Sequence, residues 1–160
     1  MALRPPQDRA TAVRPAQGGD AGAMADVFLA ARATMLYLPD LHSEDETRAF
    51  IRSMVDKSEA FVAVRDDRVV GFLCLRDHWL EHLYVHPDCF NKHVGTRLLE
   101  HAKMARPAGF QLWVFQDNDG ARRFYERHGC RVARLTEGRD NEEKLPDALY
   151  VWPATREPSV

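Results

Sequence analysis

The chain has 160 residues, a length typical of one globular domain with a substantial core. Hydrophobic residues make up 45% of it and charged residues 29%, and the formal net charge is −2 at pH 7. This balance is ordinary for a globular protein, and it argues against nucleic acid or an anionic membrane as a partner.

The ends of the chain and its cysteines predict a single domain in a reducing compartment. Residues 1–9 are polar, contain two prolines and lack the apolar run of a secretory signal, so we expect a disordered tail. We expect one domain over 10–153 and a C-terminal tail over 154–160. The cysteines are odd in number and widely spaced, which favours buried free thiols and a cytoplasmic location. They are Cys74, Cys89 and Cys130.

The first half of the chain predicts a strand, two helices and a hairpin. Residues 10–14 suit a short strand, and Asp20 is a candidate cap for the first helix. The apolar side of that helix carries Met24, Val27, Phe28, Ala31 and Met35. Ser43 and Glu46 form a capping-box pattern at the start of a second helix. Its expected inward residues are Phe50, Ile51, Met54 and Val55. Residues 60–64 and 69–75 then predict a hairpin around Asp66–Asp67.

The next segment predicts a strand, a tight loop and a helix in that order. Residues 79–85 are β-prone, and Pro87 ends the strand. The helix that follows presents Val94, Leu98, Leu99 and Ala102 on one face. Unpaired backbone N–H groups at such a helix start converge on one point and favour a phosphate or pyrophosphate. Lys92 and Arg97 add positive charge there, so this segment is the expected cofactor site.

A second unit of a strand and a helix follows. Residues 110–115 predict a buried strand, and residues 117–129 a helix that Gly129 ends. The apolar face of this helix carries Ala121, Phe124, Tyr125 and His128. Strands over 130–135 and 148–152, joined by the polar loop 136–147, complete the chain. The sequence therefore predicts an α/β (α+β) fold with helices packed on a sheet.

With these elements in this order, the chain resembles the GNAT superfamily of N-acetyltransferases. The family's second signature, Asn-x-x-Ala-x-x-x-Tyr-x-x-x-Gly, is matched by Asn118, Ala121, Tyr125 and Gly129. The resemblance implies a mixed, mostly antiparallel sheet of six to seven strands. It also implies about four helices on both faces and a splay between the fourth and fifth strands.

The family's acyl-CoA loop, [Gln/Arg]-x-x-Gly-x-[Gly/Ala], falls on residues 90–95 and departs from the pattern. Phe90 stands where Gln or Arg is usual, and His93 stands where the first glycine is usual. A side chain at that position is strained if φ must be positive, although His tolerates this region better than most residues. Gly95 keeps the second glycine. We expect a loop that binds CoA less tightly than the family pattern.

The resemblance implies acetyl-CoA as co-substrate, no metal, and Tyr125 as the general acid for the departing thiolate. Glu81 is the candidate general base, on an assumed strand face shared with Trp79, Leu83 and Val85. A solvated or salt-bridged surface Glu is the equally weighted alternative. The expected cofactor-binding residues are Leu83, Tyr84, Val85, Asn91, Lys92, His93, Val94, Gly95, Thr96, Arg97, Asn118 and Tyr125. A backbone amide near Leu83 would serve the oxyanion, and Asn118 would also cap its helix.

Two other functions remain open from the sequence. A non-catalytic acyl-CoA-binding module is favoured by the altered loop. A zinc enzyme is suggested by the His-x-x-Glu-His pattern at 78–82, extended by His86, but it would require a helix there. The acceptor expected from the resemblance is a small-molecule or peptide amine, held between the loop with Tyr37, Leu38 and His42 and the loop over 137–143. A homodimer is also left open.

Overall fold

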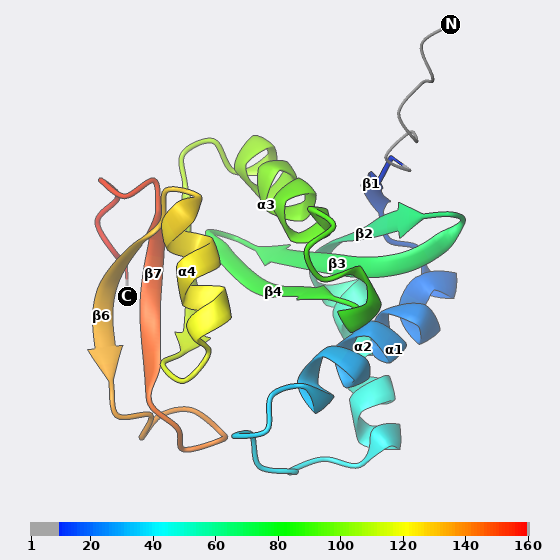
Figure 1. Ribbon diagram of the computed structural model, residues 1–160, viewed down its shortest axis with the longest axis horizontal. Helices are drawn as coiled ribbons and strands as arrows, with labels where there is room; N and C mark the ends of the chain where they lie inside the picture. The colour runs from blue at the N-terminus through cyan, green and yellow to red at the C-terminus, as the bar shows by residue number, and fades with distance from the viewer. Residues whose placement is uncertain (1–9, 160) are drawn as a thin grey trace, which may run out of the picture.

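The computed structural model describes residues 10–159, so the predicted tail over 1–9 lies outside the described part. A seven-stranded sheet in the order β1-β2-β3-β4-β5-β7-β6 forms its centre (Figure 1). The strands are β1 (Ala12–Pro15), β2 (Glu59–Arg65), β3 (Arg68–Arg76), β4 (Trp79–Val85), β5 (Phe110–Phe115), β6 (Arg131–Thr136) and β7 (Asp147–Trp152). The α-helices are α1 (Ala21–Ala33), α2 (Glu44–Lys57), α3 (Val94–Ala105) and α4 (Asp119–Arg127).

The sheet is split between its two middle strands. β4 and β5 are the one parallel pair among the described strands, and they meet only at Trp79 and Gln111. Beyond that point the strands diverge, and Figure 1 shows the gap between β4 and the unit formed by α4, β5 and β7. The predicted splay between the fourth and fifth strands is therefore confirmed, and beyond Trp79 one edge of β4 has no partner among the strands of residues 10–159.

Helices cover both faces of the sheet, as predicted. Leu98 and Leu99 of α3 and Tyr125 of α4 belong to one buried cluster with Leu73, Phe110 and Tyr150 of the sheet. Met24 of α1 and Ile51 of α2 belong to a second cluster on the other face, with Phe72 and Cys74. All three cysteines are unpaired and buried. Within residues 10–159, none of the helices has the length and hydropathy that a membrane span requires.

A β-bulge in β4 changes which face its side chains occupy. Leu75 of β3 pairs with Leu80, but the neighbouring Cys74 pairs with His82, so Glu81 is an extra residue. An extra residue shifts the alternation of side chains by one position. Leu80 and Leu83 accordingly both pack in the cluster under α3. The assumption that Glu81, Leu83 and Val85 share a face is therefore wrong.

The start of α2 agrees with the sequence, but one of its expected core residues does not. The Ser43 hydroxyl accepts the Glu46 amide N–H at 3.1 Å, and the Glu46 carboxylate accepts the Ser43 amide, which confirms the capping box. Ile51 and Met54 are buried as predicted. Phe50 is 51% exposed and lines a surface pocket, because the helix turns it past the edge of the core. The prediction that Phe50 points inward is wrong.

The last described residues pack along the sheet. The Gln111 side chain donates to the Ser159 carbonyl at 2.8 Å and accepts the Ser159 amide at 2.9 Å. The Arg131 guanidinium donates to the Ala154 carbonyl at 2.6 Å. These bonds satisfy the fully buried side chain of Gln111, which would otherwise be a costly polar group in the core.

Candidate functional site

A cavity of about 910 Å³ opens beside the split in the sheet. We call it the larger cavity. Its walls come from the end of α1 and the loop after it, the second half of β4, the loop before α3, the first turn of α3, and one side of α4 along its length. The predicted cofactor-binding residues that line it are Leu83, Tyr84, Val85, Asn91, His93, Val94, Gly95, Thr96, Asn118 and Tyr125.

The start of α3 presents free amides to this cavity. The first helical hydrogen bond runs from the Arg97 amide to the His93 carbonyl at 3.1 Å, and no side chain caps the helix. Among the bonds between described residues, none uses the amide N–H groups of Val94, Gly95 or Thr96. Such a helix start attracts an anion, because the free donors and the helix dipole act together.

The loop before α3 holds two residues in the left-handed region. Asn91 has φ +63° and His93 has φ +62°. Both positions therefore carry the conformation that glycine adopts most readily. The structure thus explains why glycine is usual at the position of His93, and it shows that His93 still allows α3 to begin there.

Replacing His93 with glycine is expected to tighten CoA binding. Removing the imidazole opens the approach of a pyrophosphate to the amides, and a gain of about 1.4 kcal/mol in binding free energy corresponds to about tenfold in affinity. Calorimetric titration of CoA into the wild type and His93→Gly measures the difference. Equal or weaker binding by the variant would show that the imidazole is itself a useful contact.

The positive charges predicted beside the loop are placed differently. The Arg97 guanidinium donates to the Thr11 carbonyl at 3.2 Å, and Arg97 is absent from the cavity lining. Lys92 is exposed and also absent from the lining. Arg127 and His128 of the α4 end line the cavity instead. The spacing of α4 placed His128 on an apolar face, but it could not distinguish a residue that faces core from one that faces a cavity.

His128 joins α3 to α4 at the cavity wall. Its Nδ1 lies 2.8 Å from the Phe124 carbonyl, which can only accept, so Nδ1 carries the proton. In the neutral ring Nε2 then accepts from the Thr96 hydroxyl, 3.2 Å away. This pair of bonds fixes the first turn of α3 against α4 and so fixes the direction of the free amides.

Tyr125 lies on α4 with its ring buried and its residue lining the cavity. Burial raises the pKa of its hydroxyl above the ordinary value of 10.0, so the phenol stays protonated at neutral pH. No hydrogen bond between described residues engages this hydroxyl. The proton is therefore available to a group bound in the cavity. The Asn118 side chain accepts the Ala121 amide at 3.1 Å, which confirms its predicted capping role.

Tyr37, on the loop between α1 and α2, reaches the same cavity. Its ring meets Phe115 edge to face at a centroid distance of 6.1 Å. Its hydroxyl is buried without a hydrogen-bond partner of good geometry, and burial raises its pKa. Thr34 and Met35 line the cavity beside it. The prediction that Met35 continues the apolar side of the first helix is wrong, because α1 ends at Ala33, and no sequence signal indicated Thr34.

A second cavity, of about 550 Å³, lies between α2 and the beginning of β4. We call it the α2 pocket. Phe50, Lys57, Arg76, Trp79, Glu81, His82 and Trp113 are among its lining residues. The bulge places Glu81 here, with Arg76 at 2.6 Å from its carboxylate, and not among the residues that line the larger cavity beside Tyr125.

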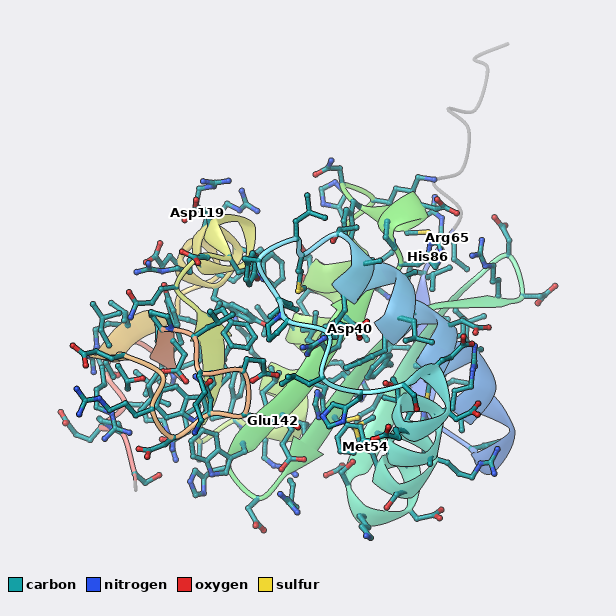
Figure 2. All side chains as sticks on the ribbon, turned by 90° about the horizontal axis from the view of Figure 1, so that it is seen from below. Asp40, Met54, Arg65, His86, Asp119 and Glu142 are labelled. Carbon is teal, nitrogen blue, oxygen red and sulfur yellow. The ribbon has the colours of Figure 1, made fainter. Side chains whose placement is uncertain are left out.

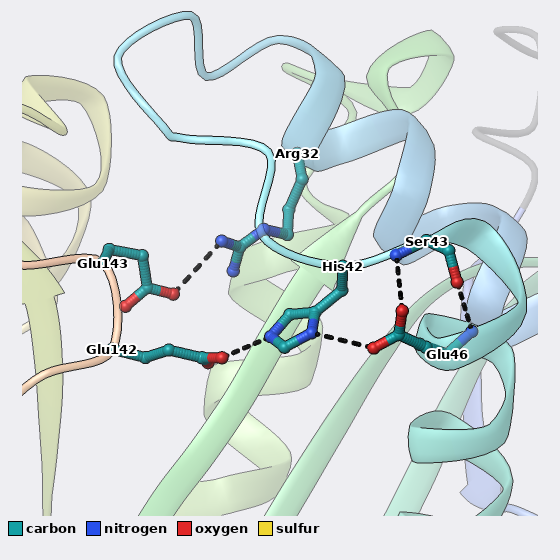
Figure 3. A network of polar contacts seen from close by, with 6 residues as sticks. All are labelled: Arg32, His42, Ser43, Glu46, Glu142 and Glu143. Atoms are coloured by element: carbon teal, nitrogen blue, oxygen red, sulfur yellow. Dashed lines mark hydrogen bonds and ion pairs between the residues drawn. The ribbon is translucent and has the colours of Figure 1, made fainter.

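Ion pairs bridge two loops that are distant in sequence, the loop between α1 and α2 and the loop between β6 and β7. The Arg32 guanidinium lies 3.4 Å from the Glu143 carboxylate, and His42 pairs with Glu142 (Figure 3). The other nitrogen of His42 lies 3.4 Å from Glu46, at the start of α2. Figure 2 shows Asp40 of the first loop and Glu142 of the second in the middle of the molecule, between α4 and α2.

The His42 bridge is expected to stabilise the fold more at low pH than at high pH. Glu46 and Glu142 raise the pKa of His42 above 6.5, so its contribution is complete below the unfolded pKa and is lost as pH rises through the folded one. Urea unfolding of the wild type and His42→Gln at about pH 5.5 and 8.5 measures this effect. The difference between the two proteins should shrink at the higher pH, and an unchanged difference would contradict the prediction.

The zinc alternative requires a helix where the structure has a strand. Trp79–Val85 form β4, and His78 lies in the turn before it. His78, His82 and His86 therefore do not share a helix face. Across the part of the chain that the structure describes, no group of three or more His, Cys, Asp or Glu side chains is placed to hold a metal ion.

Comparisons with known proteins agree on one family. A sequence profile of the acetyltransferase (GNAT) domain matches residues 56–131. The peptidyl-lysine N-acetyltransferase YjaB of Escherichia coli K12 is 30% identical over 102 residues, which are 63% of this chain and 69% of that protein. The Salmonella typhimurium protein of the same name is 28% identical over 109 residues, 68% of this chain and 74% of that protein.

Solved structures share the fold. The apo form of Escherichia coli YjaB aligns with a TM-score of 0.74 and 24% identity, covering 89% of this chain and 97% of that one. The PaiA N-acetyltransferase of Thermoplasma acidophilum, solved in complex with coenzyme A, aligns with a TM-score of 0.65 and 19% identity. That alignment covers 89% of this chain and 98% of the other.

Proposed function

Since the chain belongs to the GNAT family of acetyltransferases, we propose that it transfers an acetyl group from acetyl-CoA to a primary amine. The observation that carries this proposal is the larger cavity, which is lined both by the start of α3 and by Tyr125, whose hydroxyl has no partner among residues 10–159. The amides at that helix start would bind a diphosphate, and the hydroxyl would donate its proton to a thiolate.

The cavity fits the donor in shape and chemistry. The amides of Val94, Gly95 and Thr96 would hold the pyrophosphate, because they have no other partner among the described residues. The free edge of β4 after Trp79 would pair with the amide groups of an extended pantetheine arm, as an added strand does. A Cβ on Gly95 would come within 3.4 Å of Phe124, so little space separates the helix start from the opposite wall.

The reaction that we propose is direct attack by the amine on the acetyl carbon. When bound, acetyl-CoA supplies an activated acyl group. The ammonium would lose its first proton to a base outside the larger cavity, which frees the nitrogen lone pair for the new C–N bond; Glu81, which lines the α2 pocket, is our candidate for that base. A backbone amide of β4 near Leu83 would donate to the carbonyl oxygen as the C–S bond breaks. Tyr125 would protonate the departing sulfur and regain a proton from the newly formed amide nitrogen.

The acceptor that we propose is the side-chain amine of a peptide or protein lysine. The curated relatives carry the name peptidyl-lysine N-acetyltransferase, and this chain spans about 70% of the length of each of them. Tyr37 of the loop between α1 and α2 lines the larger cavity, so this loop would meet an acceptor that enters it.

The test is consumption of acetyl-CoA in the presence of single amines, with CoA binding measured in parallel. Lysine peptides, free polyamines and small aromatic amines form the panel. Turnover with a lysine peptide, with one amide formed per free thiol released, supports the proposal. Binding of CoA without turnover over the whole panel would replace it with an acyl-CoA-binding module. Absence of CoA binding would contradict both functions.

A further inference from the structure

His128, directly after α4, lines the larger cavity and bonds twice to α3. Its Nε2 lies 3.2 Å from the Thr96 hydroxyl, and its carbonyl accepts a hydrogen bond from the Lys103 ammonium at 2.6 Å. Thr96 also lines the cavity, and it belongs to the first turn of α3, whose amide N–H groups make no bond within residues 10–159. A single hydroxyl therefore separates this imidazole from the place where we propose that a diphosphate binds.

The bond from His128 to Phe124 decides how the Thr96 hydroxyl is used. Because the Phe124 carbonyl holds a proton on Nδ1, the neutral ring has only a lone pair at Nε2. The Thr96 hydroxyl then donates to Nε2, and its proton is not available to a ligand. Once Nε2 also carries a proton, it donates to the Thr96 oxygen, and the hydroxyl can rotate its own proton toward the cavity. The charge on His128 therefore sets whether Thr96 can donate to a bound group.

Two cations lie beside His128. Lys103 reaches its carbonyl from α3, and Arg127, its neighbour in the chain, lines the same cavity. The other titratable or charged groups on the adjoining segments are His93 before α3, Glu100 of α3, Glu126 of α4, Cys130 after it and Arg131 of β6. The Cys130 thiol stays neutral at pH 7, because burial raises its pKa to about 11. Within residues 10–159 no carboxylate forms an ion pair with the His128 ring. A bound diphosphate would add negative charge here, and an opposite charge nearby favours the charged form of an imidazole.

We propose that His128 takes up a proton when CoA binds, and that Thr96 transmits this change to the diphosphate. The proposal rests on the CoA site of the proposed function. Solvent supplies the proton to Nε2, the Nε2–H donates to the Thr96 oxygen, and the Thr96 O–H donates to a phosphate oxygen. The diphosphate thereby gains a donor beside the α3 amides. Because an imidazole changes its charge between about pH 5 and 8, CoA affinity is highest at the acid end of this range and falls as pH rises. His128 is thus a positioning residue that makes cofactor affinity depend on pH.

Calorimetric titration with dephospho-CoA tests this coupling. The probe keeps the diphosphate but lacks the 3′-phosphate monoester, whose second proton is lost near about pH 6 and would mask the effect. Titrations at about pH 7.4 in HEPES and in Tris, whose heats of ionisation differ, count the protons taken up. The wild type should take up protons, and its affinity should fall about tenfold between about pH 6 and 8. His128→Gln should take up none and show a flat pH profile. A wild type that takes up no proton would overturn the proposal.

Variants at Thr96 and His93 separate the proposed path from other sources of the proton. Thr96→Ser keeps the hydroxyl and should keep the uptake, whereas Thr96→Val keeps the shape and should lose it. Uptake that persists in Thr96→Val would show that the charge acts without the hydroxyl, against the proposal. His93→Asn is the matched control for a second imidazole at the cavity, because asparagine tolerates the left-handed φ of +62°. It should keep the uptake, and loss of uptake there would assign the proton to His93 instead.

Failure of this proposal and failure of the proposed function give different results. Turnover of a lysine peptide without proton uptake on binding keeps the acetyl transfer and overturns the coupling. Proton uptake that requires His128 and Thr96, with no turnover of any amine, keeps the coupling and overturns the transfer. Binding of CoA but not of dephospho-CoA would show that the diphosphate is not the group held here, and the coupling falls. A protein that binds neither molecule contradicts both proposals.

Discussion

Tyr125→Phe is expected to lower the rate of acetyl transfer about 100-fold, the contribution typical of a well-placed general acid. The substitution removes the one proton donor on α4 that we propose for the thiolate, and it keeps the ring that packs beside Phe124 and Tyr150. Single-turnover measurement of thiol release reports the chemical step directly. An unaltered rate would remove Tyr125 from this role.

Stability and cofactor affinity provide the controls for this variant. The hydroxyl has no partner among residues 10–159, so its loss leaves no donor or acceptor of the protein unsatisfied. The thermal midpoint should stay the same or rise slightly, and CoA affinity should be nearly unchanged. A fall in stability together with the rate would indicate a packing role for Tyr125. Tyr150→Phe is the matched variant, because its hydroxyl bonds to Arg122 and Glu126 on the outer side of α4.

Gly138→Ala is expected to destabilise the loop between β6 and β7 by about 2 kcal/mol. Gly138 has φ +81°, and a Cβ there would overlap the Leu145 carbonyl oxygen. The loop cannot move away easily, because the Asn141 side chain donates to that same carbonyl at 2.7 Å and accepts the Leu145 amide at 3.2 Å. Urea unfolding measures the loss of stability.

Gly138→Ala is expected to weaken binding of the acceptor and not binding of CoA. Glu142 and Glu143 stand on this loop and pair with His42 and Arg32, so the acceptor KM should rise while CoA affinity stays constant. Gly22→Ala is the control, because a Cβ at Gly22 of α1 meets nothing within 4 Å. Alanine there should be neutral or stabilising by about 1 kcal/mol. Equal effects of the two variants would contradict this account of Gly138.

Local patterns predicted most of the fold. The capping box of α2, the hairpin turn at Asp66–Asp67 and the order of strands and helices are all signals carried by neighbouring residues, and the structure confirms them. The split between β4 and β5 came from the family resemblance and not from periodicity. The predicted ends of helices and strands differ from the observed ends by one or two residues, because fraying and capping depend on tertiary contacts that the sequence does not show.

The site was predicted less completely, for two physical reasons. A β-bulge leaves no strong sequence signal, and this one moved Glu81 into the α2 pocket beside His82. The contacts of a long side chain depend on its tertiary surroundings. The Arg97 guanidinium donates to the Thr11 carbonyl and does not reach the loop before α3. Burial lowers the pKa of His82 to about 4, which keeps its ring neutral at pH 7, and spacing alone could not have indicated this.

The single ladder contact between β4 and β5 divides the molecule into two half-sheets, β1–β4 and β5–β7, that share few backbone hydrogen bonds. An extended ligand arm bound between β4 and β5 would hydrogen-bond to the edge of β4 and so hold the two half-sheets together. Saturating acetyl-CoA should therefore raise the melting temperature and slow amide hydrogen exchange on β4 more than on β2, which is already paired on both sides. In this architecture the co-substrate completes the scaffold that holds it.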